Sequence, residues 1–327
     1  MIISASRRTD IPAWYGEWML RRLQEGVVMT RNPMNPRQVR RVDLSPQTVD
    51  CIVFWSKNPA PFFAGLDAVD TMGYPYYFQF SLTPYGQEME RYLPPKEKLA
   101  GDFCRLAQRL GPRRVVWRYD PIIVSAAYPA QWHLEAFYRM SRALRGYTDT
   151  CVISFVDLYE KTRKNTGSLV PGEVPIDVRQ QLAKQFAQMA AQAGMRLCAC
   201  CEEDLSACGV HKSACIDAQR VEEISGRPLA SGLKTGEKGG QRPGCGCAQS
   251  VDLGAYHTCQ NGCVYCYATS SQQRARRSFA MHDPSSPLLI GQLAGNEKIT
   301  AYPIQLPKSM PIGDEDAEDV PQQTKLF

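Results

Sequence analysis

The sequence has no long run of apolar residues, and this sets the first limit on its function. None of its apolar stretches approaches the roughly 20 residues that a membrane-spanning helix needs. The N-terminus, MIISASRRTD, lacks the charged start and apolar stretch of a secretory signal peptide. We therefore expect a cytoplasmic protein, in which thiols stay reduced and a disulfide framework is not expected.

The sequence also lacks a glycine-rich dinucleotide-binding loop after any of its expected strands. Short runs rich in Val, Ile, Phe and Tyr predict strands, and helical patterns that end before a glycine lie between them. The expected strands are residues 2–6, 51–56, 76–83, 114–123, 150–157, 196–201 and 250–256. The expected helices are residues 12–25, 97–110, 129–145 and 176–193, with another near 264–280.

This alternation predicts an α/β fold with parallel strands joined by helical crossovers. Seven strands in 327 residues favour a full or partial (β/α) barrel, and an open doubly wound sheet is the alternative. We expect residues 1–200 to form barrel units and residues 201–249 a Cys-rich auxiliary metal-binding segment. Residues 250–290 would add the last strand, a cysteine loop and a helix, and residues 291–327 a flexible tail.

Charge is unevenly distributed along the chain. The net charge is +5, but the run DEDAED at residues 314–319 is acidic, so residues 1–313 carry 37 Lys and Arg against 28 Asp and Glu. A basic body is compatible with a polyanionic partner, although an ordinary solvated surface explains the charge equally well.

Polar residues follow the carboxyl ends of several expected strands, where active sites lie in a parallel barrel. Lys57 and Asn58 follow the second strand, Arg118 and Asp120 lie in the fourth, and Asp157 ends the fifth. An arginine within the apolar run VVWRYDP needs a partner, because an unpaired buried charge is costly. These five residues are our candidates for substrate or cofactor contacts.

The stretch HTCQNGCVYC places Cys259, Cys263 and Cys266 close together. Three thiolates at this spacing can each bind one iron of a [4Fe–4S] cluster and leave the fourth iron open. A zinc site that adds His257 is the alternative, but structural zinc sites usually use two well-separated ligand pairs. The spacing favours iron–sulfur.

This loop resembles the cluster loop of radical S-adenosylmethionine enzymes, with Tyr265 in its aromatic position. The resemblance implies that the open iron binds S-adenosylmethionine, that Tyr265 lies near the adenine, and that reductive cleavage gives a 5′-deoxyadenosyl radical. A flavodoxin or ferredoxin would supply the electron.

In most of that superfamily the cluster loop follows the first strand, whereas here it follows the last. A circular permutation restores the usual order, because the termini of such domains can lie close together. The strand after the loop would then be the N-terminal one, which makes Ser4, Ser6 and Arg7 candidate cofactor contacts. The Gly-Gly-Glu stretch usual at this place is absent.

The chain as a whole resembles an uncharacterised bacterial family known as domain of unknown function 1848. The likeness lies in SASRRTDIP, FWSKNP, WRYDPI, the CGC pair and TCQNGCVYCYA. That family is placed near spore photoproduct lyase-like proteins, and the likeness implies no activity by itself.

A second set of cysteines lies between residues 198 and 247. We choose Cys200, Cys215, Cys245 and Cys247 as four thiolate ligands, and Cys201 is an alternative to Cys200. Four thiolates suit an auxiliary [4Fe–4S] cluster or a zinc ion. Free buried thiols are the other interpretation.

The chain ends in QTKLF, which resembles the short peptide by which bacterial repair and replication proteins bind the sliding clamp. Gln323, Leu326 and Phe327 match that peptide. Together with the basic body, this favours an enzyme that acts on a DNA lesion or nucleotide. The alternatives are a radical enzyme for a small molecule or peptide, and a non-enzymatic iron–sulfur or zinc protein that binds nucleic acid.

Overall fold

The computed structural model describes residues 1–157, 163, 165–202, 205–229, 233–239 and 244–303. Eight parallel strands form the main sheet in the order β10-β1-β4-β5-β6-β7-β8-β9. The strands are β1 (Ile2–Ala5), β4 (Cys51–Ser56), β5 (Tyr76–Ser81), β6 (Val115–Ile122), β7 (Thr150–Phe155), β8 (Arg196–Ala199), β9 (His211–Lys212) and β10 (Ser250–Asp252). The expected parallel α/β fold is confirmed. Because β10 and β9 form its two edges, the sheet is consistent with a partial barrel.

Strand β10 lies beside the N-terminal strand β1, although 248 residues separate the paired residues Ser4 and Asp252. The two strands pair in parallel, with Ile2 opposite Ser250 and Ser4 opposite Asp252. The loop that follows β10 therefore begins next to the loop that follows β1. A circularly permuted strand order requires that the last strand and the first strand of the chain be adjacent in the sheet.

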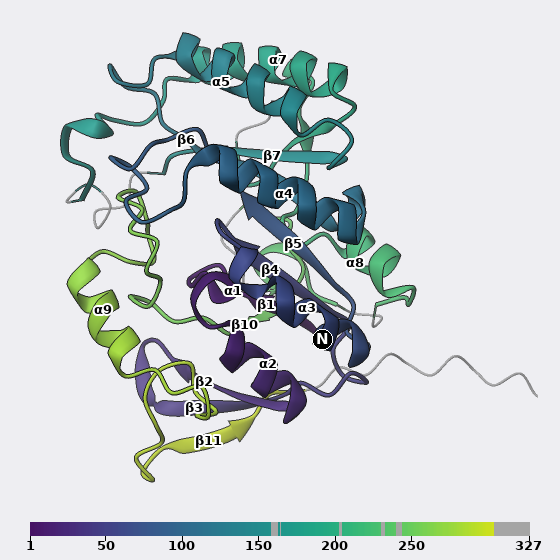
Figure 1. Ribbon diagram of the computed structural model, residues 1–327, viewed down its shortest axis with the longest axis vertical. Helices are drawn as coiled ribbons and strands as arrows, with labels where there is room; N and C mark the ends of the chain where they lie inside the picture. Colours follow the sequence, from purple (N-terminus) through teal and green to yellow (C-terminus); the bar gives the residue numbers. More distant parts are fainter. Residues whose placement is uncertain (158–162, 164, 203–204, 230–232, 240–243, 304–327) are drawn as a thin grey trace, which may run out of the picture.

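One face of the sheet is covered by helices, as Figure 1 shows. They are α2 (Gly16–Gln24), α3 (Leu66–Thr71), α4 (Lys96–Leu110), α5 (Ala130–Ala143) and α7 (Ile176–Gln192), with the short α1 (Ile11–Trp14) before α2. Aromatic rings fill the space beneath them: Phe137 of α5 stacks on Trp117 of β6 at 5.0 Å and on Phe186 of α7 at 4.1 Å. Burial of such large apolar side chains is the main force that holds the helices on the sheet.

The other face of the sheet is covered by the Cys-rich segment and α8 (Ala218–Ser225). Val53, Tyr77 and Val116 point to this side and pack with Ile216 and Val221. We call this side the inner face of the sheet. Successive strand residues alternate between faces, so on β6 the residue that follows Val116 on the inner face is Arg118.

A second sheet was not expected from the sequence. It has the order β11-β3-β2, with β2 (Val27–Asn32), β3 (Asn35–Asp43) and β11 (Lys298–Ala301). Strand β3 reads NPRQVRRVD, so it has little apolar signal, and backbone pairing holds it. Arg31 also binds Glu297 at 2.9 Å. Residues 298–301 thus form a strand inside the segment that the sequence analysis treats as a tail.

The helix after the cysteine loop, α9 (Gln272–Ala280), begins later than the expected residue 264. Ser271 caps it by accepting a hydrogen bond from the backbone N–H of Arg274. Residues 264–270 instead form the irregular chain around Cys266. The clamp-like residues Gln323, Leu326 and Phe327 lie outside the described residues. In the described part of the chain no helix is both long and apolar enough to cross a membrane.

Candidate metal and cofactor site

A cavity of about 460 Å³ lies at the carboxyl ends of the main-sheet strands. Its volume falls within the range of roughly 300–1,000 Å³ found for small-molecule sites. It brings together most of the candidates from the sequence: Ser6, Arg7, Lys57, Arg118, Asp120, Asp157, Cys200, Cys215, Cys245, Cys247, Cys259, Cys263, Tyr265 and Cys266. Two candidates do not line it: Ser4, which is fully buried, and Asn58.

The three-cysteine loop presents its thiols to this cavity. The backbone N–H groups of Asn261 and Asp10 act to lower the pKa of Cys259, and those of Ala268 and Thr269 act to lower the pKa of Cys266. Such N–H groups favour the thiolate form that binds iron–sulfur clusters.

Burial alone would keep these thiols protonated. Desolvation raises the pKa of Cys259 to about 12, and it also raises the pKa of Cys263 and Cys266. The charge of Lys57 acts in the opposite direction on Cys263. A bound metal would replace the protons and remove this cost.

Asn261 holds the loop against the N-terminal strand. Its side-chain N–H donates to Asp10 at 2.8 Å, and its side-chain oxygen accepts from Trp14 Nε1 at 2.7 Å. Asp10 also accepts from Ser56 Oγ at 2.7 Å and from the backbone N–H of Lys57 at 2.8 Å. The ends of β1 and β4 and the cysteine loop are thereby tied to one buried carboxylate.

Glu90 is a second buried carboxylate, which the sequence analysis missed. It accepts from Lys57 Nζ at 2.8 Å and Thr83 Oγ1 at 2.7 Å, and it also binds Lys96 and the hydroxyl of Tyr265. Burial would raise its pKa, but the charges of Lys57 and Lys96 outweigh this effect and hold the pKa of Glu90 at about 2.

Lys57 is therefore in an ion pair with Glu90, and the hydrogen bond to Glu90 fixes the hydroxyl end of Tyr265. Glu90 lies between β5 and α4, away from any strand end, so no local pattern marked it.

Asp252 is a third carboxylate that the sequence analysis missed. It accepts from Ser4 Oγ at 2.8 Å, Ser6 Oγ at 2.7 Å, the backbone N–H of Arg7 at 2.9 Å and Arg8 Nε at 3.1 Å. Ser4 and Ser6 are therefore anchors of the β1–β10 junction. Only the parallel pairing of β1 with β10 brings these partners together.

Arg118 links the strand ends to the second cysteine set. It donates to Cys215 Sγ at 3.0 Å and binds Asp120, and Asp120 also accepts from Ser154 Oγ. Its guanidinium lies 5.2 Å from the ring centre of Trp55. The expectation that this buried arginine has a charged partner is met by Asp120.

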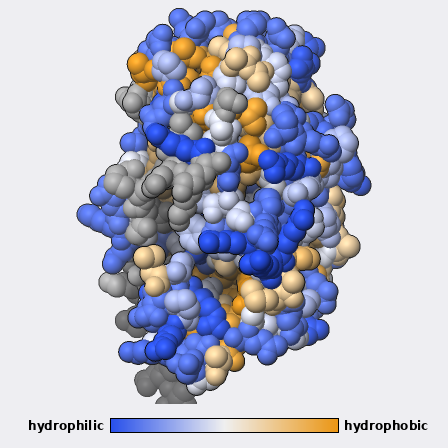
Figure 2. Space-filling view, turned by 90° about the vertical axis from the view of Figure 1, so that its left-hand side faces the viewer, coloured by the Kyte–Doolittle hydropathy of each residue, from blue (hydrophilic) through white to orange (hydrophobic). Residues whose placement is uncertain are grey.

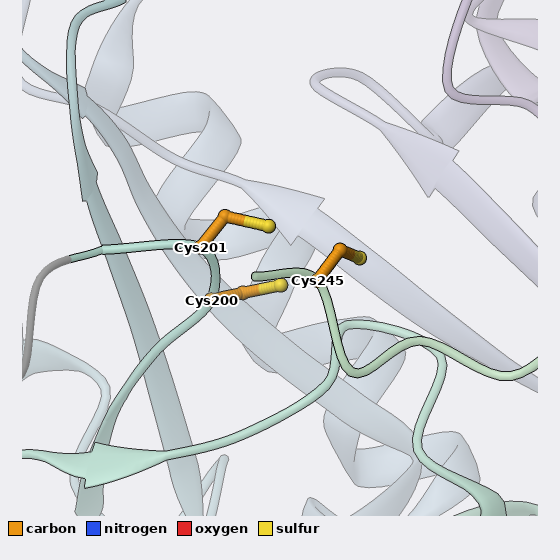
Figure 3. Close-up of side chains that lie close together, drawn as sticks. All are labelled: Cys200, Cys201 and Cys245. Atoms are coloured by element: carbon orange, nitrogen blue, oxygen red, sulfur yellow. The ribbon is translucent and has the colours of Figure 1, made fainter. Parts of the chain in front are cut away.

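The second cysteine set converges at one corner of the same cavity. The sulfurs of Cys200, Cys215 and Cys247 lie within 4.8 Å of one another, and so do those of Cys200, Cys201 and Cys245. Figure 3 shows Cys200 and Cys201 together after β8, with Cys245 of the returning segment beside them. These two overlapping triads are able to bind a metal ion or an iron–sulfur cluster.

Comparison with known proteins gives one match. The model of a family described as domain of unknown function (DUF1848) matches residues 2–268. No curated protein and no solved structure matches the chain. The matched residues include both cysteine sets and every described side chain discussed for the cavity.

Proposed function

The chain belongs to the DUF1848 family, and from its own residues we propose that it is a radical S-adenosylmethionine enzyme. The observation that carries the proposal is the convergence of Cys259, Cys263 and Cys266 on one cavity with Tyr265 beside them. Bound there, a [4Fe–4S] cluster would supply the electron that cleaves S-adenosylmethionine and starts hydrogen abstraction from a substrate.

The spacing of the three thiols fits this group better than a single zinc ion. Four sulfurs around one zinc lie only about 3.8 Å apart, since Zn–S bonds are about 2.3 Å. The sulfurs of Cys259, Cys263 and Cys266 are not all within 4.8 Å of one another. Wider spacing suits ligands that each bind a different iron.

The cavity walls offer groups for the two ends of the cofactor. Tyr265 is held by Glu90, so its ring has a fixed orientation for a nucleobase. Arg7 faces the cavity from the end of β1 with its backbone fixed by Asp252. We assign Arg7 to the carboxylate of the methionine part, because a guanidinium pairs well with a carboxylate.

A DNA lesion or a nucleotide is the substrate class that we propose. Arg7, Arg8, Lys57 and Arg118 line the cavity. Helix α9, directly after the cysteine loop, exposes Arg274, Arg276 and Arg277. Helix α9 lies at the left of Figure 1, and Figure 2 shows that hydrophilic residues cover most of that face. Exposed arginines suit phosphate contacts.

Two partners complete the proposal. A flavodoxin or ferredoxin would supply the electron, and the C-terminal residues Gln323, Leu326 and Phe327 would bind a sliding clamp. A radical enzyme for a small molecule or peptide remains the second candidate, because the cavity itself has the volume of a small-molecule site.

The proposal is tested by anaerobic reconstitution with iron and sulfide, followed by dithionite and S-adenosylmethionine. We expect 5′-deoxyadenosine, detected by chromatography, and its loss in Cys263→Ala. Cys104→Ala in α4 is the matched control and should retain the product. A reconstituted protein that releases no 5′-deoxyadenosine, with or without DNA, would overturn the proposal.

Salt-dependent DNA binding separates the two substrate classes. A DNA enzyme should bind duplex or single-stranded DNA with an affinity that falls steeply as salt rises, and Arg276→Glu with Arg277→Glu should weaken it. Binding that is absent at low salt would favour the small-molecule or peptide enzyme.

A further inference from the structure

The cysteines of the second set are packed too closely for an iron–sulfur cube. The sulfurs of Cys200, Cys215 and Cys247 lie within 4.8 Å of one another. Cys200 also lies within this distance of Cys245 and Cys201, which form a second triad with it. Cys200 therefore belongs to both triads and joins Cys245 to the group of Cys215 and Cys247.

The distance between neighbouring sulfurs distinguishes the two metal centres that four cysteines can hold. A tetrahedral zinc ion with four thiolates sets neighbouring sulfurs about 3.8 Å apart. In a [4Fe–4S] cluster each thiolate binds a different iron, and the sulfurs then lie on the order of 6 Å apart. The limit of 4.8 Å within each triad agrees with the single ion.

The surroundings of the four sulfurs suit an anionic metal–thiolate centre. The backbone N–H of Ile216 donates to Cys247 Sγ at 3.4 Å, and Arg118 donates to Cys215 Sγ at 3.0 Å. Arg7 lies close enough for its charge to act on Cys247 and Cys215. Zinc with four thiolates has a net charge of −2, and positive charge beside the sulfurs stabilises such a centre.

The backbone is also shaped around this group. Gly236, in the left-handed region at φ +59°, donates its N–H to the carbonyl of Cys247 at 3.1 Å. A Cβ at Gly236 would lie 3.0 Å from the carbonyl of Cys245. Cys201 adopts a φ of +58°, a conformation that costs a non-glycine residue free energy. Metal binding at Cys200 would supply the free energy that holds this turn.

We propose that Cys200, Cys215, Cys245 and Cys247 bind one zinc ion, with Cys201 as an unligated thiol facing the cavity. The ion fixes the Cys-rich segment on the inner face of the sheet and, through Cys215, holds Arg118 in the cavity wall. This inference does not depend on the radical chemistry.

The test uses the full chain with Cys259→Ser, Cys263→Ser and Cys266→Ser, purified without added iron. Elemental analysis should find one zinc per chain, and X-ray absorption at the zinc edge should find four sulfurs at about 2.3 Å. Several iron atoms with sulfide per chain would overturn the proposal, and so would the absence of a tightly bound metal.

The ligand choice is tested in the same background. Cys247→Ser should lower zinc content at least tenfold, whereas Cys201→Ser and the matched control Cys208→Ser should retain one zinc. If Cys247→Ser does not fold, absorption of the cobalt-exchanged parent chain reports the number of thiolates instead. Loss of zinc in Cys201→Ser, or fewer than four thiolates in the parent, would overturn the assignment.

Discussion

At the scale of single residues, three carboxylates determine how the cavity is built: Asp10 and Glu90 are buried, and Asp252 is partly buried. Asp10, Glu90 and Asp252 each collect donors from segments far apart in the sequence. Shielding each of these carboxylates from water would cost free energy if its hydrogen-bond donors were absent. Removing one donor should therefore destabilise the fold less than removing the acceptor that several donors share.

Glu90→Gln should destabilise the protein by about 2–4 kcal/mol, because it leaves Lys57 and Lys96 near one another without the carboxylate between them. Urea unfolding measures the loss. Glu97→Gln, at an exposed position in the first turn of α4, is the control and should change stability by less than about 0.5 kcal/mol. Equal effects in the two variants would show that the Glu90 network contributes nothing special.

A pH effect follows from His133 of α5, which is fully buried against Tyr119 of β6. Its ring contacts Tyr119 O–H at 2.9 Å and the carbonyl of Ile123 at 2.8 Å. Burial lowers the pKa of His133 to about 4. The unfolded chain binds the proton more readily than the folded one, so stability falls as pH drops from about 6.5 toward 4, by up to about 3 kcal/mol.

Urea unfolding of His133→Gln across this range should show a smaller loss than the parent chain. A histidine NMR titration should place the midpoint of His133 well below 6.5. A midpoint near 6.5 would contradict the burial argument.

At the scale of elements, the apolar strands were predictable and the polar ones were not. The runs CIVFWS and YYFQFS carry the signal of buried strands, and they form β4 and β5. Strand β3 has only two fully buried side chains, Val39 and Val42, so its pairing with β2 and β11 left little trace in hydrophobicity. Such strands depend on tertiary context rather than on local pattern.

The same contrast holds for the site. Strand-end position indicated Lys57, Arg118 and Asp120 as cavity residues. Their partners Glu90 and Asp252 could not be found in this way, because only the folded chain brings them close. Cysteine spacing indicated both thiol groups, since ligand spacing along the chain is itself the signal.

The cysteine loop should be sensitive to the amide of Asn261. Asn261→Asp replaces the donor to Asp10 with a second carboxylate 2.8 Å away, and like charges repel in a buried site. We expect iron content after reconstitution to fall at least fivefold. Asn296→Asp, at an exposed position away from this loop, should bind iron as the parent does. Full iron occupancy in Asn261→Asp would contradict this role for the amide.

At the scale of the whole molecule, the two cysteine groups lie on one cavity although they come from different parts of the chain. The pairing of β10 with β1 brings the first group to the strand ends, and the Cys-rich segment brings the second from the inner face. Arg118 connects them through Cys215 and Asp120. The cavity wall is therefore shared between both groups.

Arg118→Lys tests this shared wall. Lysine keeps the charge but cannot donate to Cys215 and Asp120 at once with a planar group. We expect the rate of 5′-deoxyadenosine release to fall at least tenfold while iron content is unchanged. Arg139→Lys, on the exposed side of α5, should leave the rate as it is. An unchanged rate in Arg118→Lys would remove Arg118 from the working site.

We propose that Cys259, Cys263 and Cys266 hold a cluster with one iron open to S-adenosylmethionine. Electron paramagnetic resonance of the dithionite-reduced protein, recorded with and without S-adenosylmethionine, reports whether the cofactor binds that iron. We predict the signal of one reduced [4Fe–4S] cluster whose g values change when S-adenosylmethionine is added. Identical spectra in the two samples, or no iron–sulfur signal after reconstitution, would contradict the account.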